Sequence, residues 1–173
     1  SADAHEIDIS ADGEYIAVGA DKTLYFFSKD SSSPLWSYTF SSGIQTDDNG
    51  VVISSDGNYI AVIIGSGYLY FFDKDFTDDE YLWKYDISSP TSLAISSNGD
   101  YITVGTRSGA KVYLFDKEFT NDEPLWTYTA GESQLYMFSV DISADGEYIV
   151  AGSSKNGQTP GRVFTFDKDS STP

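Results

Sequence analysis

The chain of 173 residues contains no cysteine and only one histidine, His5. Disulfide bonds, thiolate metal sites and cysteine nucleophiles are therefore excluded. A serine nucleophile needs a base beside it, and a single histidine near the amino terminus offers none to the recurring serines described below. These absences disfavour the commonest hydrolytic and redox sites.

Positive charge is also scarce, with 10 Lys and Arg against 27 Asp and Glu and a net charge of −17. Such a chain has few cations to place on phosphates, so we expect neither a nucleic-acid partner nor binding to an anionic membrane. No apolar run approaches the roughly 20 residues of a membrane helix, which predicts no membrane insertion. The first residue is Ser, which suggests a processed or trimmed end. The Asp-rich, Lys-poor composition favours an extracellular or cell-surface location.

Aromatic residues are abundant, at 16%, and they recur within a repeat. "ISADGEYIAVGA", "ISSDGNYIAVII", "ISSNGDYITVGT" and "ISADGEYIVAGS" begin at Ile9, Ile53, Ile95 and Ile142. Each copy is followed by an aromatic run, at 24–27, 69–72, 112–115 and 163–166, and then by an acidic turn. The first three copies continue into Leu-Trp-x-Tyr, at 35–38, 82–85 and 125–128.

Each copy predicts four short strands, which we call a, b, c and d. Strand a ends at the isoleucine, and Asp-Gly or Asn-Gly closes a tight turn to strand b. Strands b and c are apolar at successive positions, which indicates burial on both faces. Stacked propeller blades bury their strands in this way, and a repeat of 42 to 47 residues matches the propeller period.

The predicted fold is therefore all-β, a β-propeller of four-stranded antiparallel blades within one domain, 1–173. The blades are expected at 6–40, 50–86, 91–129 and 138–173. The fourth lacks its outer strand, because the chain reaches Pro173 before a Leu-Trp-x-Tyr segment. We expect a fragment of a longer repeat protein; the alternatives are two copies joined into a ring of about eight blades, or a head-to-tail filament.

Two propeller families share these motifs. The "ISADGEYIAVGA" half is similar to the hairpin of WD-repeat propellers. The "GYLYFFDKD…YLWKY" segment, 67–85, resembles the blade of pyrroloquinoline-quinone-type propellers. The resemblance implies a blade and not a reaction. The Gly-His and Trp-Asp marks of WD repeats are absent, as are the Thr-Gly-Lys turn and adjacent cysteines of quinoproteins, so a quinone cofactor is not implied.

Most residues that could be catalytic occupy the same position in successive repeats. Asp12, Asp56 and Asp145 occupy one turn position, which the turn itself explains. A glycosidase-like pair among the acidic residues stays an alternative, although no two are marked out. The acidic turn 73–80 offers Asp73, Asp75 and Asp78 as weak calcium ligands beside the default of a solvated turn, and we expect no other cofactor.

The charge is expected to lie on one rim of the propeller. The a–b and c–d turns share that rim and hold 18 acidic residues against four lysines, whereas the other rim is nearly neutral. On the second rim the segments 130–138 and 153–161 depart from the repeat, with Leu135, Tyr136 and Met137 expected to be exposed. Because the scaffold does not require these departures, we predict a partner-binding surface there. Its expected contacts are Arg107, Tyr136, Lys155 and Arg162.

The sequence thus favours a non-enzymatic binding or scaffold module of a secreted or cell-surface protein, within a larger propeller or assembly. The expected partner is a protein, a carbohydrate or another copy of the chain. A structural subunit of an extracellular filament or surface layer is the first alternative. A propeller hydrolase or quinoprotein-like enzyme is the second.

Overall fold

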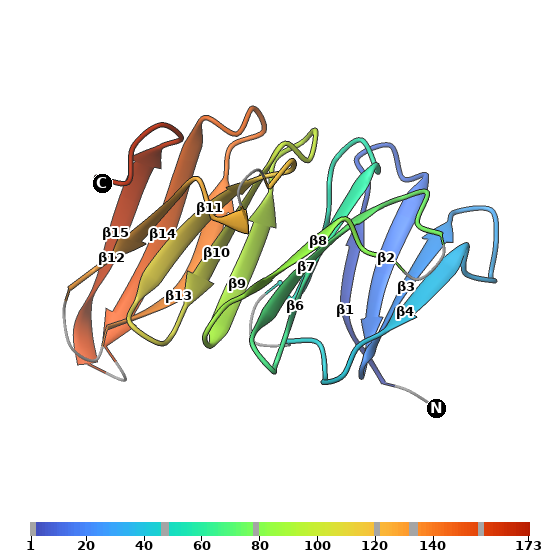
Figure 1. Cartoon of the computed structure of the whole chain (residues 1–173), viewed down its shortest axis with the longest axis horizontal. Helices are drawn as coiled ribbons and strands as arrows, with labels where there is room; N and C mark the ends of the chain where they lie inside the picture. Colours follow the sequence, from blue (N-terminus) through green and yellow to red (C-terminus); the bar gives the residue numbers. More distant parts are fainter. Residues whose placement is uncertain (1–2, 46–48, 78–79, 120–121, 132–134, 156–157) are drawn as a thin grey trace.

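A computed structural model describes residues 3–45, 49–77, 80–119, 122–131, 135–155 and 158–173, with only the backbone at 155 and 158–160. In these residues fifteen strands form four antiparallel sheets that stand side by side (Figure 1). The first and fourth sheets lie at opposite ends of the row, beside the two termini. No α-helix occurs in the described residues.

The strands follow the repeat. Sheet 1 contains β1 (Ala4–Ile9), β2 (Tyr15–Ala20), β3 (Thr23–Ser28) and β4 (Trp36–Thr39). Sheet 2 contains β5 (Val51–Ile53), β6 (Tyr59–Ile64), β7 (Tyr68–Asp73) and β8 (Trp83–Asp86). Sheet 3 contains β9 (Pro90–Ile95), β10 (Tyr101–Thr106), β11 (Lys111–Asp116) and β12 (Trp126–Thr129). Sheet 4 contains β13 (Leu135–Ile142), β14 (Tyr148–Lys155) and β15 (Gln158–Asp167). The expected absence of a fourth strand beside β15 is confirmed for the described residues.

Local sequence explains the hairpins. β-Branched and aromatic residues dominate strands b and c, and these residues favour extended backbone. The glycine of each a–b turn has a positive φ, between 73° and 76°, which an L-residue adopts only at a cost. The predicted strands a all end at their isoleucine, as expected.

The inner sheets are buried on both faces, as the successive apolar positions predict. Every residue of β6 and β10 after its first tyrosine is buried. Three apolar clusters fill the spaces between consecutive sheets, one for each neighbouring pair. The stacked sheets therefore form one continuous core.

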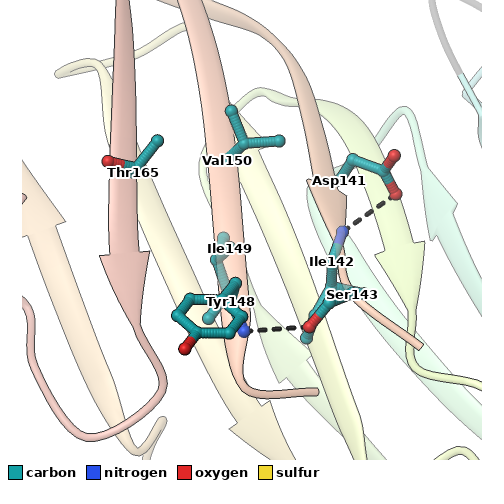
Figure 2. A pocket seen from close by; sticks show the side chains of 7 residues that line it. All are labelled: Asp141, Ile142, Ser143, Tyr148, Ile149, Val150 and Thr165. Carbon is teal, nitrogen blue, oxygen red and sulfur yellow. Dashed lines mark hydrogen bonds between the residues drawn. The ribbon is translucent and has the colours of Figure 1, made fainter. Parts of the chain in front are cut away.

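The outer faces of the two end sheets are exposed. On sheet 1, Ile7 and Ile9 are 71% and 54% exposed. On sheet 4, Tyr148 and Val163 are 63% and 73% exposed. We call these surfaces the open face of sheet 1 (Ile7, Ile9, Gly13, Lys29) and the open face of sheet 4 (Asp141, Tyr148, Val150, Val163, Thr165). The open face of sheet 4 contains a hollow of about 300 Å³. Figure 2 shows the side chains that line this hollow.

Sheet 4 corrects two expectations. β13 begins at Leu135, and Leu135 and Met137 are buried against sheet 3, although we expected them to be exposed. Alternate residues of a strand point to opposite faces, so only Tyr136 between them stays partly exposed. The segment 153–161, expected as a long loop, continues the hairpin instead, with pairing as far as Lys155 and Gln158. Ladder hydrogen bonds satisfy backbone groups that a loop would leave to water.

Candidate functional site

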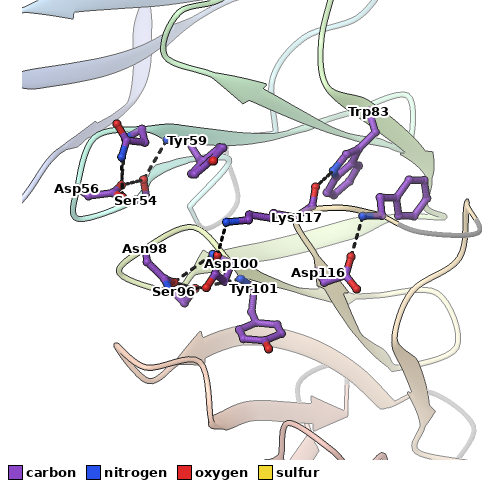
Figure 3. A network of polar contacts seen from close by, with 12 residues as sticks. Ser54, Asp56, Tyr59, Trp83, Ser96, Asn98, Asp100, Tyr101, Asp116 and Lys117 are labelled. Atoms are coloured by element: carbon purple, nitrogen blue, oxygen red, sulfur yellow. Dashed lines mark hydrogen bonds and ion pairs between the residues drawn. The ribbon is translucent and has the colours of Figure 1, made fainter.

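In each a–b turn the serine bonds to the aspartate, or in sheet 3 to the asparagine, two residues later. Figure 3 shows the turns of sheets 2 and 3. In sheet 2 the Ser54 hydroxyl donates to Asp56 Oδ1 at 2.6 Å and accepts from the backbone N–H of Tyr59 at 3.0 Å. Asp56 Oδ1 also accepts from the backbone N–H of Asn58 at 3.0 Å. The same bonds recur around Ser10, Ser96 and Ser143. These side chains brace a turn, which is the role that the sequence predicted for them.

The turn networks hold their carboxylates in the charged form. The Ser10 hydroxyl and the backbone N–H of Glu14 lower the pKa of Asp12, and Ser143 does the same for Asp145. Burial alone would raise the pKa of Asp56, but its bonds from Ser54 and Asn58 outweigh burial and lower it. Asn98 replaces the aspartate in sheet 3 and accepts the equivalent bonds without a charge.

This arrangement predicts a pH dependence. In the fold these three pKa values are lowered from the ordinary 3.8, so the stabilisation is present above that value and lost as pH falls through the folded pKa. The triple variant Asp12→Asn, Asp56→Asn, Asp145→Asn, which imitates Asn98, should lack this dependence. Urea titrations would give the difference in unfolding free energy between wild type and variant. We expect it to shrink as pH falls below 3.8; a difference constant into the acid range would contradict the prediction.

The same rim also joins each sheet to the next. The first tyrosine of strand b in one sheet packs on the a–b turn glycine and the c–d turn lysine of the following sheet. Lys117 Nζ lies 5.6 Å from the centre of the Tyr59 ring, and a Cβ on Gly99 would overlap that ring. Lys74 on Tyr15 and Lys168 on Tyr101 repeat the arrangement at 5.7 Å. Such cation–π contacts add electrostatic attraction to the packing.

The tryptophan of strand d completes this interface. Trp83 Nε1 donates to the carbonyl oxygen of Lys117 in the next sheet at 2.8 Å. Trp36 and Trp126 donate to the carbonyls of Lys74 and Lys168, both at 2.7 Å. The sequence showed that these residues recur, but not that they meet across sheets; recurrence was the signal that pointed to their structural role.

One carboxylate of the acidic turn 73–77 accepts a hydrogen bond within the turn. Asp73 Oδ1 accepts from the backbone N–H of Asp75 at 2.8 Å. Asp78 lies outside the described residues. Among the described side chains no group of three or more His, Cys, Asp or Glu is arranged to hold a metal ion. Calcium binding by Asp73, Asp75 and Asp78 stays a prediction.

We call the end of the stack that carries the b–c turns and d–a connections the loop rim, and the opposite end the turn rim. Arg107 lies on the loop rim, where a hollow of about 180 Å³ is lined by Gln45, Gly65, Ser89, Pro90, Thr91 and Arg107. These residues come from sheets 2 and 3 and from the connections that lead into them, so the hollow exists only in the assembled stack. The backbone N–H of Arg107 donates to the Ser89 carbonyl at 2.9 Å.

The other predicted contacts lie on sheet 4. Tyr136 pairs with Ser154 and Arg162 pairs with Ser153 in the extended part of the sheet. Arg162 lines a second hollow, with Phe138 and Val163, which does not include Arg107. The side chain of Lys155 lies outside the described residues. The loop rim thus carries Arg107 and the sheet 4 residues at two separate places.

Comparison with known proteins identifies the fold. No family model matches the chain, and no curated protein sequence matches it significantly. Among solved structures it is similar to hydrazine synthase of Kuenenia stuttgartiensis, with a TM-score of 0.76 and 16% identity over 98% of this chain and 47% of that one. It is also similar to the β-propeller domain of Cps50 (Swd1) of Myceliophteria thermophila, with a TM-score of 0.67 and 16% identity over 86% of this chain and 47% of that one.

The chain therefore has the β-propeller fold and spans less than half the length of both structures. This structural similarity, at 16% sequence identity, establishes the fold and not the activity. The predicted resemblance to β-propellers is therefore confirmed for the fold. The comparisons give no evidence for the pyrroloquinoline-quinone type of propeller. In the described residues no helix has the length and apolar character needed to cross a membrane.

Proposed function

We propose that the chain is a non-enzymatic β-propeller module that binds a protein or carbohydrate partner through its loop rim, as a binding or scaffold part of a secreted or cell-surface protein. One observation carries this proposal: the polar residues of the turn rim make the same internal contacts in sheet after sheet, whereas the loop rim holds an arginine-lined hollow and the extended hairpin of sheet 4.

The recurring polar residues of the turn rim make structural contacts. Its serines and aspartates hold the turns by hydrogen bonds, and Lys29, Lys117 and Lys168 pair with acidic residues of the a–b turns, as Lys117 does with Asp100 at 2.7 Å. Groups with complete internal partners have little left for a substrate or a base. This supports a structural role for the recurring residues in place of a catalytic one.

The charge distribution favours the loop rim as the binding surface. The turn rim carries most of the acidic residues of a chain with a net charge of −17. Its field repels acidic partners and directs them to the rim with Arg107 and Arg162. The Arg107 hollow, formed by sheets 2 and 3 and the connections that lead into them, is the position where a small acidic or hydroxyl-rich group fits best.

Arrays of defined peptides and oligosaccharides test the proposal. We expect at least one bound probe whose affinity falls about tenfold or more in the double variant Arg107→Glu, Arg162→Glu. Lys22→Glu is the matched control, because Lys22 lies in the exposed b–c turn of sheet 1, away from both hollows. Equal binding by wild type and the double variant would overturn the proposal.

A second candidate function is a structural subunit of a filament or surface layer. The open faces of sheets 1 and 4 favour it, because heterologous contacts between such faces can propagate without closing. Electron microscopy of concentrated protein would show filaments under this alternative and discrete particles under the first.

A further inference from the structure

The two open faces are halves of an interface that the chain builds three times internally. Tyr15, Tyr59 and Tyr101 are each covered by the glycine turn and the lysine of the next sheet. Tyr148 occupies the same place on sheet 4 and is 63% exposed. At the other end of the stack, a Cβ on Gly13 would meet nothing within 4 Å, and Lys29 pairs with Glu14 and Asp30 on its own sheet.

The sequence of sheet 4 strengthens this correspondence. Residues 141–149 repeat residues 8–16, "DISADGEYI", without a change. In sheet 1, Asp8 Oδ1 accepts from its neighbour Ile9 and Asp8 Oδ2 accepts from the backbone N–H of Ile53 in the next sheet at 2.9 Å. Asp141 Oδ1 makes the first of these bonds with Ile142, at 2.9 Å against 2.8 Å for Asp8 and Ile9 (Figure 2). Sheet 4 thus presents the face with which sheet 1 binds sheet 2.

The apolar parts of the two faces also complement each other. The equivalents of Ile7 and Ile9 in the later sheets are Val51, Ile53, Leu93, Ile95, Val140 and Ile142. Those residues pack on the preceding sheet. The hollow lined by Tyr148, Val150 and Thr165 lies where a preceding sheet receives them. Burial of such side chains is the main attraction between sheets.

We propose that sheet 4 of one copy docks on sheet 1 of a second copy, and that two copies close a ring of eight sheets. The comparison structures support this occupant, because the chain matches 47% of each, so two copies have nearly the length of one of those chains. Closure removes both exposed apolar faces at once. The proposal rests on the sheet-to-sheet contacts and does not involve the Arg107 hollow; the Arg162 hollow shares Val163 with the docked face.

Mass measurement of the 173-residue chain is the first test. Native mass spectrometry and light scattering at high micromolar concentration should give twice the 19.0 kDa of one chain. Val150→Glu places a charge in the docked face and should shift the mass to that of the monomer. Leu82→Glu is the matched control, because Leu82 is 51% exposed but directly precedes β8 of an inner sheet, away from both open faces, and it should stay dimeric. A wild type that is monomeric, or a control that dissociates equally, would overturn the proposal.

Engineered cysteines test the docking geometry, since the chain has none of its own. Ser55 Oγ and Ser97 Oγ, in consecutive a–b turns, lie 3.2 Å apart. The equivalent positions at the two ends are Ala11 and Ala144, both exposed. The double variant Ala11→Cys, Ala144→Cys should form a covalent dimer on oxidation, because docked copies bring these positions within disulfide range.

The controls make each result decisive. Ser55→Cys, Ser97→Cys should form a disulfide within one chain and confirm the geometry between neighbouring turns. Ala11→Cys alone and Ala144→Cys alone should stay uncrosslinked. A monomer with free thiols, a monomer with an internal disulfide, or a ladder beyond the dimer would each overturn the two-copy ring.

Discussion

Gly99→Ala is expected to lower the free energy of unfolding by about 3 kcal/mol, from a strained backbone and an overpacked interface together. Gly99 has a φ of +73°, and its added Cβ would come within 2.9 Å of Tyr59 Cγ and 3.0 Å of Tyr59 Cβ. Those atoms lie at the base of the side chain, so the tyrosine cannot move aside without leaving its place between sheets 2 and 3. The sheets themselves must separate.

Gly13→Ala separates the two costs. Gly13 has the same φ of +73° but nothing within 4 Å of an added Cβ, so only the backbone cost of about 1 kcal/mol applies. Urea denaturation followed by tryptophan fluorescence and circular dichroism would give both values. Both variants are best measured with Val150→Glu, which removes the proposed contact between copies. Equal losses at Gly99 and Gly13 would show that the Tyr59 contact does not hold the sheets together.

Trp83→Ala should lower the free energy of unfolding by about 4 kcal/mol, because it removes a large buried side chain from the interface between sheets 2 and 3. Trp83 is 8% exposed, and its ring centre lies 5.0 Å from that of Phe71 and 4.7 Å from that of Phe119. Its indole N–H also donates to the Lys117 carbonyl at 2.8 Å. No neighbouring side chain can fill the volume that the indole leaves.

Two further variants show how much of this loss in unfolding free energy comes from the indole N–H and how much from the buried ring. Trp83→Phe keeps an aromatic ring but removes the donor, so we expect a loss of about 1–2 kcal/mol from the unpaired carbonyl and the smaller ring. Leu82→Ala, at the preceding exposed position, should change the free energy of unfolding by no more than about 0.5 kcal/mol. Thermal and urea unfolding of the three variants would rank them. A Trp83→Ala variant as stable as Leu82→Ala would contradict the role of Trp83.

The same interface residues allow the contact between two copies to be compared with the interfaces inside one chain. The docked contact between copies has the tyrosine, glycine and lysine of an internal interface, but β15 has no described fourth strand to supply the tryptophan. The contact between copies is therefore expected to be weaker than an internal interface, and the loss of stability in Trp83→Ala indicates by how much. A ring that dissociates on dilution while each stack stays folded is the expected behaviour.

The hairpins of the four repeats, their turns and the stacking of the sheets follow from the sequence alone, except for the longer strands of sheet 4. Strand ends at Ile9, Ile53, Ile95 and Ile142 follow from local pattern and turn chemistry, which act over a few residues. Burial on both faces followed from the successive apolar residues of strands b and c. The repeat made these local signals reliable, because each one occurs four times.

The contacts between side chains of neighbouring sheets follow from the packing of the sheets and not from the repeat. The contacts of Tyr59 with Gly99 and Lys117, and of Trp83 with the Lys117 carbonyl, depend on how far each sheet is offset from the next. Spacing along the chain does not encode that offset, because it arises from packing between sheets. For the same reason Leu135 and Met137, predicted to lie in an exposed loop, are core residues of β13. Arg107 likewise lies in a hollow apart from Tyr136 and Arg162.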